Sequence, residues 1–263
     1  MRYLSLIRRF VEASAQQEMA YRSNFFINIL HSVLQLVVGV AGVVVIFNQV
    51  ESIRGWTFAS VLAVLGVYLL LGALRGLFIG PSLDALSGMD GEVWRGVLDF
   101  TLLRPIDTQF LASFRYWRLF SLVDLLLALS VLGLAISRLG QTLSAAHILA
   151  FLLALTAALL VLYAILLSMT ALVFWSPGFL FTWMFDGVFQ MARYPVGLYP
   201  GWLRLALTWV IPAGVMTTIP AQALAGEASP GLLLGSLSLA LVLILGASAL
   251  FRVGLRCYHS ASS

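Results

Sequence analysis

Two carboxylates lie within segments that are otherwise apolar. Asp124 falls in the stretch 119–136, and Asp186 falls in the stretch 176–194. A charge at bilayer depth is costly and usually faces the interior of a helix bundle. Each carboxylate could carry a proton or a cation, or it could form a structural ion pair. Arg118 is close enough in the sequence to be the partner of Asp124.

The densest group of acidic residues lies between positions 81 and 118. Asp90 can cap a helix that begins nearby, and three charged residues that follow it at i, i+3 and i+7 would share one face. A proline disfavours helix at the preceding residue and marks the end. We predict a short helix that either rests on the membrane or docks a protein outside it. The residues of this predicted docking helix are Glu92, Arg95, Asp99, Arg104 and Pro105.

The residue types exclude several kinds of active site. All fifteen basic residues are arginine, so the chain has no P-loop, which needs a lysine to reach nucleotide phosphates. There is no GxSxG or HExxH motif, and the three histidines lie in different segments. The single cysteine, Cys257, can form neither a disulfide framework nor a thiolate metal site. We expect no catalysis, no metal and no cofactor on this chain, and no binding of nucleic acid.

The composition indicates a membrane protein. Hydrophobic residues make up 61% of the chain and charged residues only 10%, whereas soluble domains carry roughly a quarter charged residues. We therefore predict one all-α integral membrane domain over residues 1–263, without a separate soluble domain. About 20 apolar residues are needed to cross a bilayer. Six segments meet this need: 24–47, 55–74, 119–136, 146–174, 176–194 and 232–251.

The first 22 residues differ from the spans. Apolar residues recur at helical spacing, and the basic residues fall mostly elsewhere on the helix. Such an amphipathic helix lies naturally in the membrane interface. It is either a simple anchor or an elbow helix that also contacts a partner. The apolar stripe consists of Tyr3, Leu4, Ile7, Phe10 and Val11.

The stretch 195–226 is apolar but interrupted by prolines, and its pieces are too short to span a bilayer. Irregular backbone at membrane depth is tolerated where protein buries it or where it lines a cavity. We predict a re-entrant hairpin on the outer face; one more kinked span is the alternative. The hairpin residues that we single out are Pro200, Trp202, Pro212 and Pro220.

The arginines set the orientation. If the N-terminus lies in the cytoplasm, eleven of the fifteen arginines fall in cytoplasmic segments and four fall outside. Cytoplasmic loops of membrane proteins are enriched in this way. We predict that both termini are cytoplasmic, which agrees with an even number of spans.

Three segments resemble the permease subunits of ABC-2 type exporters, in a branch of about 260 residues with six spans. They are MAYRSNFFINIL at 19–30, RGVLDFTLLRPIDTQF at 95–110, and the proline-rich stretch 193–226. The first segment is common among membrane proteins, whereas the other two are fairly specific to this branch. Together with the predicted topology, the resemblance extends over nearly the whole chain.

The resemblance implies partners and a mechanism. Such permeases work in pairs, as two copies or two related chains, in the plasma or inner membrane. A separate ABC ATP-binding subunit holds ATP and Mg, and the loop 81–114 contains the coupling helix that docks it. Stretch 195–226 matches the outer re-entrant hairpin. We expect export of a hydrophobic, drug-like or lipid-like substrate; the alternative is an ion-coupled secondary transporter that uses Asp124 and Asp186.

Overall fold

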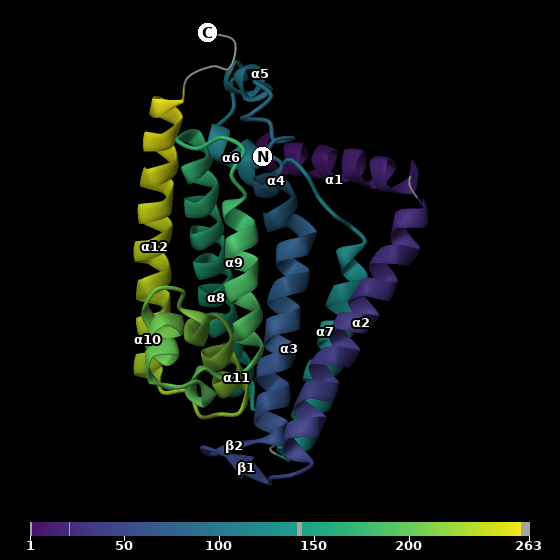
Figure 1. The fold of residues 1–263 in the computed structure, drawn as a ribbon, viewed down its shortest axis with the longest axis vertical. Helices are drawn as coiled ribbons and strands as arrows, with labels where there is room; N and C mark the ends of the chain where they lie inside the picture. Colours follow the sequence, from purple (N-terminus) through teal and green to yellow (C-terminus); the bar gives the residue numbers. More distant parts are fainter. Residues whose placement is uncertain (1, 21, 141–143, 259–263) are drawn as a thin grey trace.

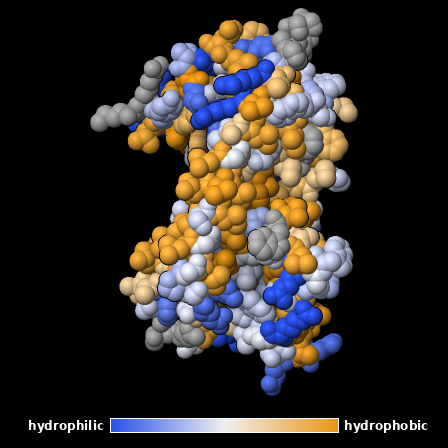
Figure 2. All heavy atoms as spheres, turned by 90° about the vertical axis from the view of Figure 1, so that its left-hand side faces the viewer, coloured by the Kyte–Doolittle hydropathy of each residue, from blue (hydrophilic) through white to orange (hydrophobic). Residues whose placement is uncertain are grey.

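The computed structural model describes residues 2–20, 22–140 and 144–258. Long helices run side by side in an elongated bundle (Figure 1). Within the described residues, five helical segments are long and apolar enough to cross a membrane. On the face shown in Figure 2, an apolar belt crosses the middle of the molecule, and hydrophilic residues gather towards both ends. The helices that form these segments are α2 (Arg22–Phe47), α3 (Phe58–Leu74), α7 (Ser121–Leu139), α8 (Ala145–Ala171) and α12 (Pro230–Cys257).

Two helix pairs form the centre of the bundle. Helix α8 packs along α12, and α3 packs along α7. Small residues allow close approach, as is common between membrane helices. A Cβ added at Gly66 of α3 would lie 2.8 Å from the Leu132 side chain of α7, and one at Gly254 of α12 would lie 2.5 Å from the ring of Phe174.

Helix α3 begins at a tight hairpin and continues beyond its regular part. Strands β1 (Ser52–Ile53) and β2 (Trp56–Thr57) pair antiparallel, and the Thr57 and Ser60 side chains cap the helix. After Leu74 the chain passes through a π-helical turn, η1 (Arg75–Ile79), into α4 (Gly80–Asp84). The combined helix Phe58–Asp84 has 27 residues.

The predicted fifth span does not form a spanning helix. The stretch 176–194 contains α9 (Phe181–Phe189) and the 3-10 turn η3 (Gln190–Arg193), after the turn η2 (Leu172–Phe174). Nine helical residues extend only about 14 Å, roughly half of a bilayer core. Pro177 and Gly178 precede α9 and Pro195 follows η3, so the chain is interrupted on both sides. The structure therefore confirms five of the six predicted spans.

The proline-rich stretch folds as short pieces, as predicted. Two of them, η5 (Gly214–Thr218) and α11 (Ile219–Leu224), pack against α8 and α3, and the stretch lies at the end of the bundle that carries β1 and β2, here the hairpin end (Figure 1). The Thr217 hydroxyl is buried and donates to the Ala192 carbonyl at 2.9 Å, which satisfies one polar group of this irregular backbone. The pieces are η4 (Val196–Leu198), α10 (Gly201–Trp209), η5 and α11.

The opposite end of the bundle, here the α1 end, carries three further helices. Helix α1 (Arg2–Ala20) crosses this end, with α5 (Leu98–Leu102) and α6 (Thr108–Phe114) beside it (Figure 1). The prediction of a helix that begins near Asp90 is wrong: residues 85–97 form turns. Gly88 and Gly96 have φ values of 82° and 69°, which a continuing α-helix does not allow.

Candidate transport cavity and docking surface

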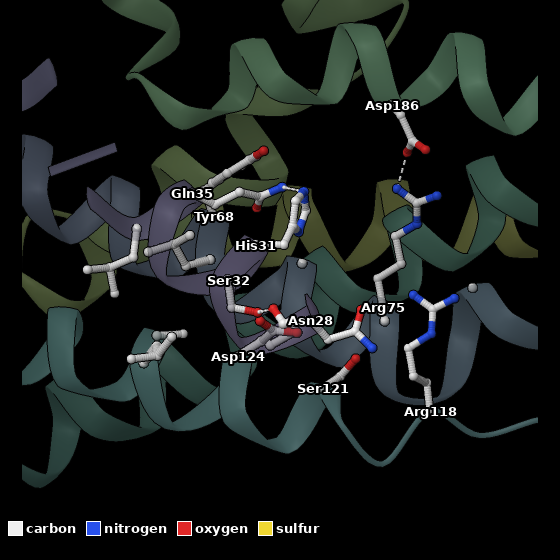
Figure 3. Close-up of a pocket in the computed structure, with 18 of the residues that line it drawn as sticks. Asn28, His31, Ser32, Gln35, Tyr68, Arg75, Arg118, Ser121, Asp124 and Asp186 are labelled. Carbon is white, nitrogen blue, oxygen red and sulfur yellow. Dashed lines mark hydrogen bonds and ion pairs between the residues drawn. The ribbon is translucent and has the colours of Figure 1, made fainter. Parts of the chain in front are cut away.

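A polar cavity of about 470 Å³, here the transport cavity, lies inside the otherwise apolar bundle. Residues of α2, α3, η1, α4, α7, α9 and η3, together with the segment that contains Arg118, line it, and Figure 3 draws most of them. Charged groups are costly at this depth, so they are expected to face one another or water. Three arginines and three aspartates give the lining a formal charge of zero: Arg75, Arg118, Arg193, Asp84, Asp124 and Asp186.

One ion pair crosses the transport cavity. Arg75, the first residue of the π-helical turn, donates to the carboxylate of Asp186 on α9 (Figure 3). The Arg75 side chain is only 15% exposed, and its guanidinium also lies 5.7 Å from the centre of the Phe185 ring. Asp186 therefore belongs to a paired site, with a partner that we did not identify from the sequence. The only feature of the sequence that pointed to Arg75 as a partner is its position directly after the apolar stretch 55–74.

Asp124 lines the same cavity but has a different environment. It is half-buried on α7, and in the described part of the chain it forms no ion pair with Arg118. The suggested Arg118–Asp124 pair is therefore not formed, although both residues line the cavity. The fold does bring Asp124 and Asp186 to one cavity.

Glu92 is buried rather than part of a docking face. Its carboxylate accepts from the Arg115 guanidinium at 3.0 and 3.3 Å and from the Tyr116 hydroxyl at 2.8 Å. Only 8% of its side chain is exposed. Burial raises the pKa of Tyr116, and the bond to Glu92 raises this pKa further. Glu92 thus fixes the turns 85–97 to the segment that follows α6.

The other predicted docking residues lie around an exposed apolar surface. Arg95, Arg104 and Pro105 are exposed, and Asp99 is half-buried. Phe100 is 70% exposed and Leu103 is 81% exposed. An exposed apolar patch with a polar rim is typical of a protein contact. We call this the docking surface: Trp94, Arg95, Asp99, Phe100, Leu103, Arg104 and Pro105.

Comparison with known protein families gives one match. Residues 33–262 match the family described as ABC-2 family transporter protein. The chain belongs to the ABC-2 transporter family. It is therefore a multi-pass membrane permease, the transport component of an ABC transporter. No match was found among curated proteins or among solved structures.

The turns 85–97 of the permease contact the segment that directly precedes α9. A Cβ at Gly178 would lie 3.1 Å from the Trp94 ring, and a Cβ at Gly88 would lie 2.8 Å from the Leu180 side chain. Helix α9 carries Asp186 into the transport cavity. The docking surface is therefore one short helix away from the Arg75–Asp186 pair.

A second connection runs through the extended segment 115–118. Its backbone groups bond with side chains of other elements: Tyr116 N–H donates to Ser82 Oγ at 2.8 Å, and Trp117 N–H donates to Ser14 Oγ of α1 at 3.1 Å. Arg118 follows them into the transport cavity. Glu92 is thus connected to the cavity lining through its contacts with this segment, and the turns that carry it contact the chain just before α9.

The residues singled out at the hairpin end do not share one surface. Pro200 and Trp202 are exposed, whereas Pro212 and Pro220 are buried. The permease instead holds this end through Arg54, whose guanidinium donates to the carbonyls of Gly197 and Tyr199 at 3.0 and 3.2 Å.

In the described residues, no three histidine, cysteine, aspartate or glutamate side chains gather as a possible metal site.

Proposed function

We propose that this permease is the membrane subunit of an ATP-driven exporter. It works as a pair, with a second copy or a related permease, and a separate ATP-binding subunit supplies the energy. The α1 end faces the cytoplasm of a cell bounded by the plasma or inner membrane, so that the docking surface meets the ATP-binding subunit. The arginine-rich segments at this end agree with that orientation.

The observation that carries the proposal is the position of the transport cavity. Three arginine and three aspartate side chains line it within an apolar bundle, and it lies next to the two connections from the docking surface. An ATP-binding subunit can shift the permease only if it binds two conformations with different affinities. Movement of the turns 85–97 would separate or rotate α9 relative to α3 and so change the Arg75–Asp186 pair.

The stretch 195–226 is proposed to cap the exit as a re-entrant hairpin. Its helices are short, and η5 and α11 pack on α8 and α3. Arg54 fastens it to the loop between β1 and β2. With α9 directly before it, this stretch would complete the sixth passage of the membrane and return the chain to α12.

The substrate is proposed to be a drug-like or lipid-like molecule that carries a polar group. The family resemblance implied a hydrophobic substrate, but the charged and amide side chains of this lining would remain unpaired against a purely hydrocarbon ligand. An unpaired buried polar group is costly. An amphiphile satisfies the lining with its polar part and leaves its apolar part to the surrounding helices or lipid.

The partner can be tested by co-purification. A tagged permease is isolated from native membranes in mild detergent, and we expect a stoichiometric ATP-binding protein with it. The variant Phe100→Ala/Leu103→Ala removes two exposed apolar side chains and should reduce the recovered ATPase by about tenfold or more. Met19→Ala is the matched control, because Met19 is 64% exposed but lies on α1. Unchanged recovery with the double variant would disprove the docking assignment.

The cavity can be tested in the reconstituted complex. Asp186→Asn leaves the Arg75 guanidinium without its partner and should strongly reduce ATP-dependent transport while the ATPase still co-purifies. The double variant Arg75→Gln/Asp186→Asn removes both charges and should recover part of the transport. Transport that runs on an ion gradient without ATP would instead identify the ion-coupled carrier.

A further inference from the structure

Two cavities meet at the α1 end. The transport cavity shares lining residues with a second cavity of about 520 Å³, which lies between the second half of α1, the beginning of α2 and residues 116–120. The two cavities therefore adjoin, one beneath α1 and the other between α2, α3, α7 and α9, and we call the two together the passage. The shared residues are Asn28, Pro81, Arg118 and Phe120.

The second cavity lies at the edge of the apolar belt. Helix α1 crosses the bundle at a steep angle to α2 (Figure 1), and its apolar stripe suits the membrane interface. Three polar residues of α1 line the cavity: Ser14, Gln17 and Glu18. These features fit a cavity at the depth of lipid head groups, in the leaflet on the α1 side.

Arg118 stands where the two cavities join. Its backbone N–H donates to the Leu77 carbonyl at 2.9 Å, which fixes its position. Its side chain is exposed, and across residues 2–20, 22–140 and 144–258 it forms no ion pair. In Figure 3 it extends beside Arg75. A guanidinium of this kind is well suited to bind the oxygens of a phosphate.

Acidic groups lie on both sides of Arg118. The Oε2 atom of Glu18 accepts from the Leu119 N–H at 3.0 Å, and Glu18 lines the second cavity. Burial raises the pKa of Glu18, although the backbone hydrogen bonds from Leu119 and Phe120 and the charge of Arg118 oppose this shift. A cation in the second cavity would stabilise the Glu18 carboxylate. Asp124 lines the transport cavity on the other side.

We propose that this passage binds the head group of a zwitterionic phospholipid-like amphiphile and admits it from the leaflet on the α1 side. The phosphate binds Arg118, and the ammonium group binds Glu18 first and Asp124 after the head group has moved inward. A zwitterion also matches the balanced charges of the transport cavity, three arginines against three aspartates. This proposal rests on the proposed transport function and adds to it a substrate class and a route of access.

The test uses the purified transporter complex in nanodiscs of uncharged digalactosyl diacylglycerol, without nucleotide. A small fraction of photoreactive phosphatidylethanolamine is added, and cross-linked residues are mapped by mass spectrometry. We expect labels at 116–120 and 24–28. Arg118→Ala should reduce them about tenfold, since a charge-assisted contact is lost, and Arg118→Lys should reduce them less. Arg138→Ala is the control, because Arg138 is exposed at the other end of α7.

A second variant tests the passage itself. Asn28→Leu replaces a polar group where the cavities join, and it should reduce labels at 69–76 of α3 and η1 while labels at 116–120 remain. This pattern cannot arise from general unfolding. Equal labelling in wild type and Arg118→Ala, or labels confined to the outside of the bundle, would overturn the site.

Further outcomes decide the ligand. Equal labelling by photoreactive phosphatidylglycerol would overturn the zwitterionic class. Displacement by millimolar glycerophosphoethanolamine would show that a soluble head group is sufficient and would overturn the lipid source. The ATPase recovered in the same samples tests the proposed function separately. Labelling without an ATPase would refute only that function, and an ATPase without labelling would refute only the head-group site.

Discussion

Glu92 offers the sharpest test of how the docking surface is held. Replacement by alanine removes the carboxylate that pairs with Arg115 and accepts from the Tyr116 hydroxyl. The Arg115 side chain is only 22% exposed, so its charge would remain largely buried without a partner. Breaking a buried pair from one side costs about 3–5 kcal/mol. We expect about 3 kcal/mol, the lower limit, because Arg115 keeps some contact with water.

Two milder variants separate charge from shape. Glu92→Gln keeps an acceptor for both partners and should cost about 1–2 kcal/mol. Glu92→Gln/Arg115→Gln removes both charges and should fall within about 1 kcal/mol of the wild type, because desolvation of an ion pair offsets much of its attraction. Asp90→Asn is the matched control, since Asp90 is an exposed acid two positions away.

The assay combines stability with partner binding. Unfolding of the detergent-solubilised permease is followed by intrinsic fluorescence during heating, and the recovered ATPase is measured for the same samples. The order of stability should be wild type and Asp90→Asn, then the double variant, then Glu92→Gln, then Glu92→Ala. If Glu92→Ala unfolds at the same temperature as the wild type and retains the ATPase, then Glu92 neither stabilises the turns 85–97 nor positions the docking surface.

Three further predictions concern packing, pH and the hairpin end. Gly66→Ala should destabilise the bundle by about 1–3 kcal/mol in the same heating assay, whereas Gly133→Ala, with nothing within 4 Å of the added Cβ, should not. Folding raises the pKa of Tyr116, so the contribution of Tyr116 to stability is complete below pH about 10 and is lost as the pH rises through the pKa of the folded state. The variant Tyr116→Phe should therefore lose less stability at alkaline pH than the wild type. An unchanged pH profile in this variant would argue against the role of Tyr116. Arg54→Ala loses two hydrogen bonds and should speed hydrogen exchange at 195–199 by about tenfold, with exchange in α8 as the internal reference.

Hydropathy predicted most of the membrane helices. Lipid contact requires long uninterrupted apolar helices, so α2, α3, α7, α8 and α12 could be located within a few residues. The segment before Tyr194 is also apolar, but average hydropathy does not measure whether a helix continues. Pro177, Gly178 and Pro195 reduced it to α9 and η3. The same residue types correctly predicted the short pieces of 195–226.

The sequence by itself determined the membrane class, five of the six predicted spans, the amphipathic character of α1 and the absence of a P-loop lysine, because these properties depend on local composition and period. Only the tertiary structure decided which charges meet. Arg75 and Asp186 are 111 positions apart, and no periodicity relates them. Helical spacing placed Glu92 on an outer face, but turns at Gly88 and Gly96 direct it inward to Arg115. A buried charge is stabilised by whichever partner the packed helices bring to it, and that partner is set by the fold rather than by neighbouring residues.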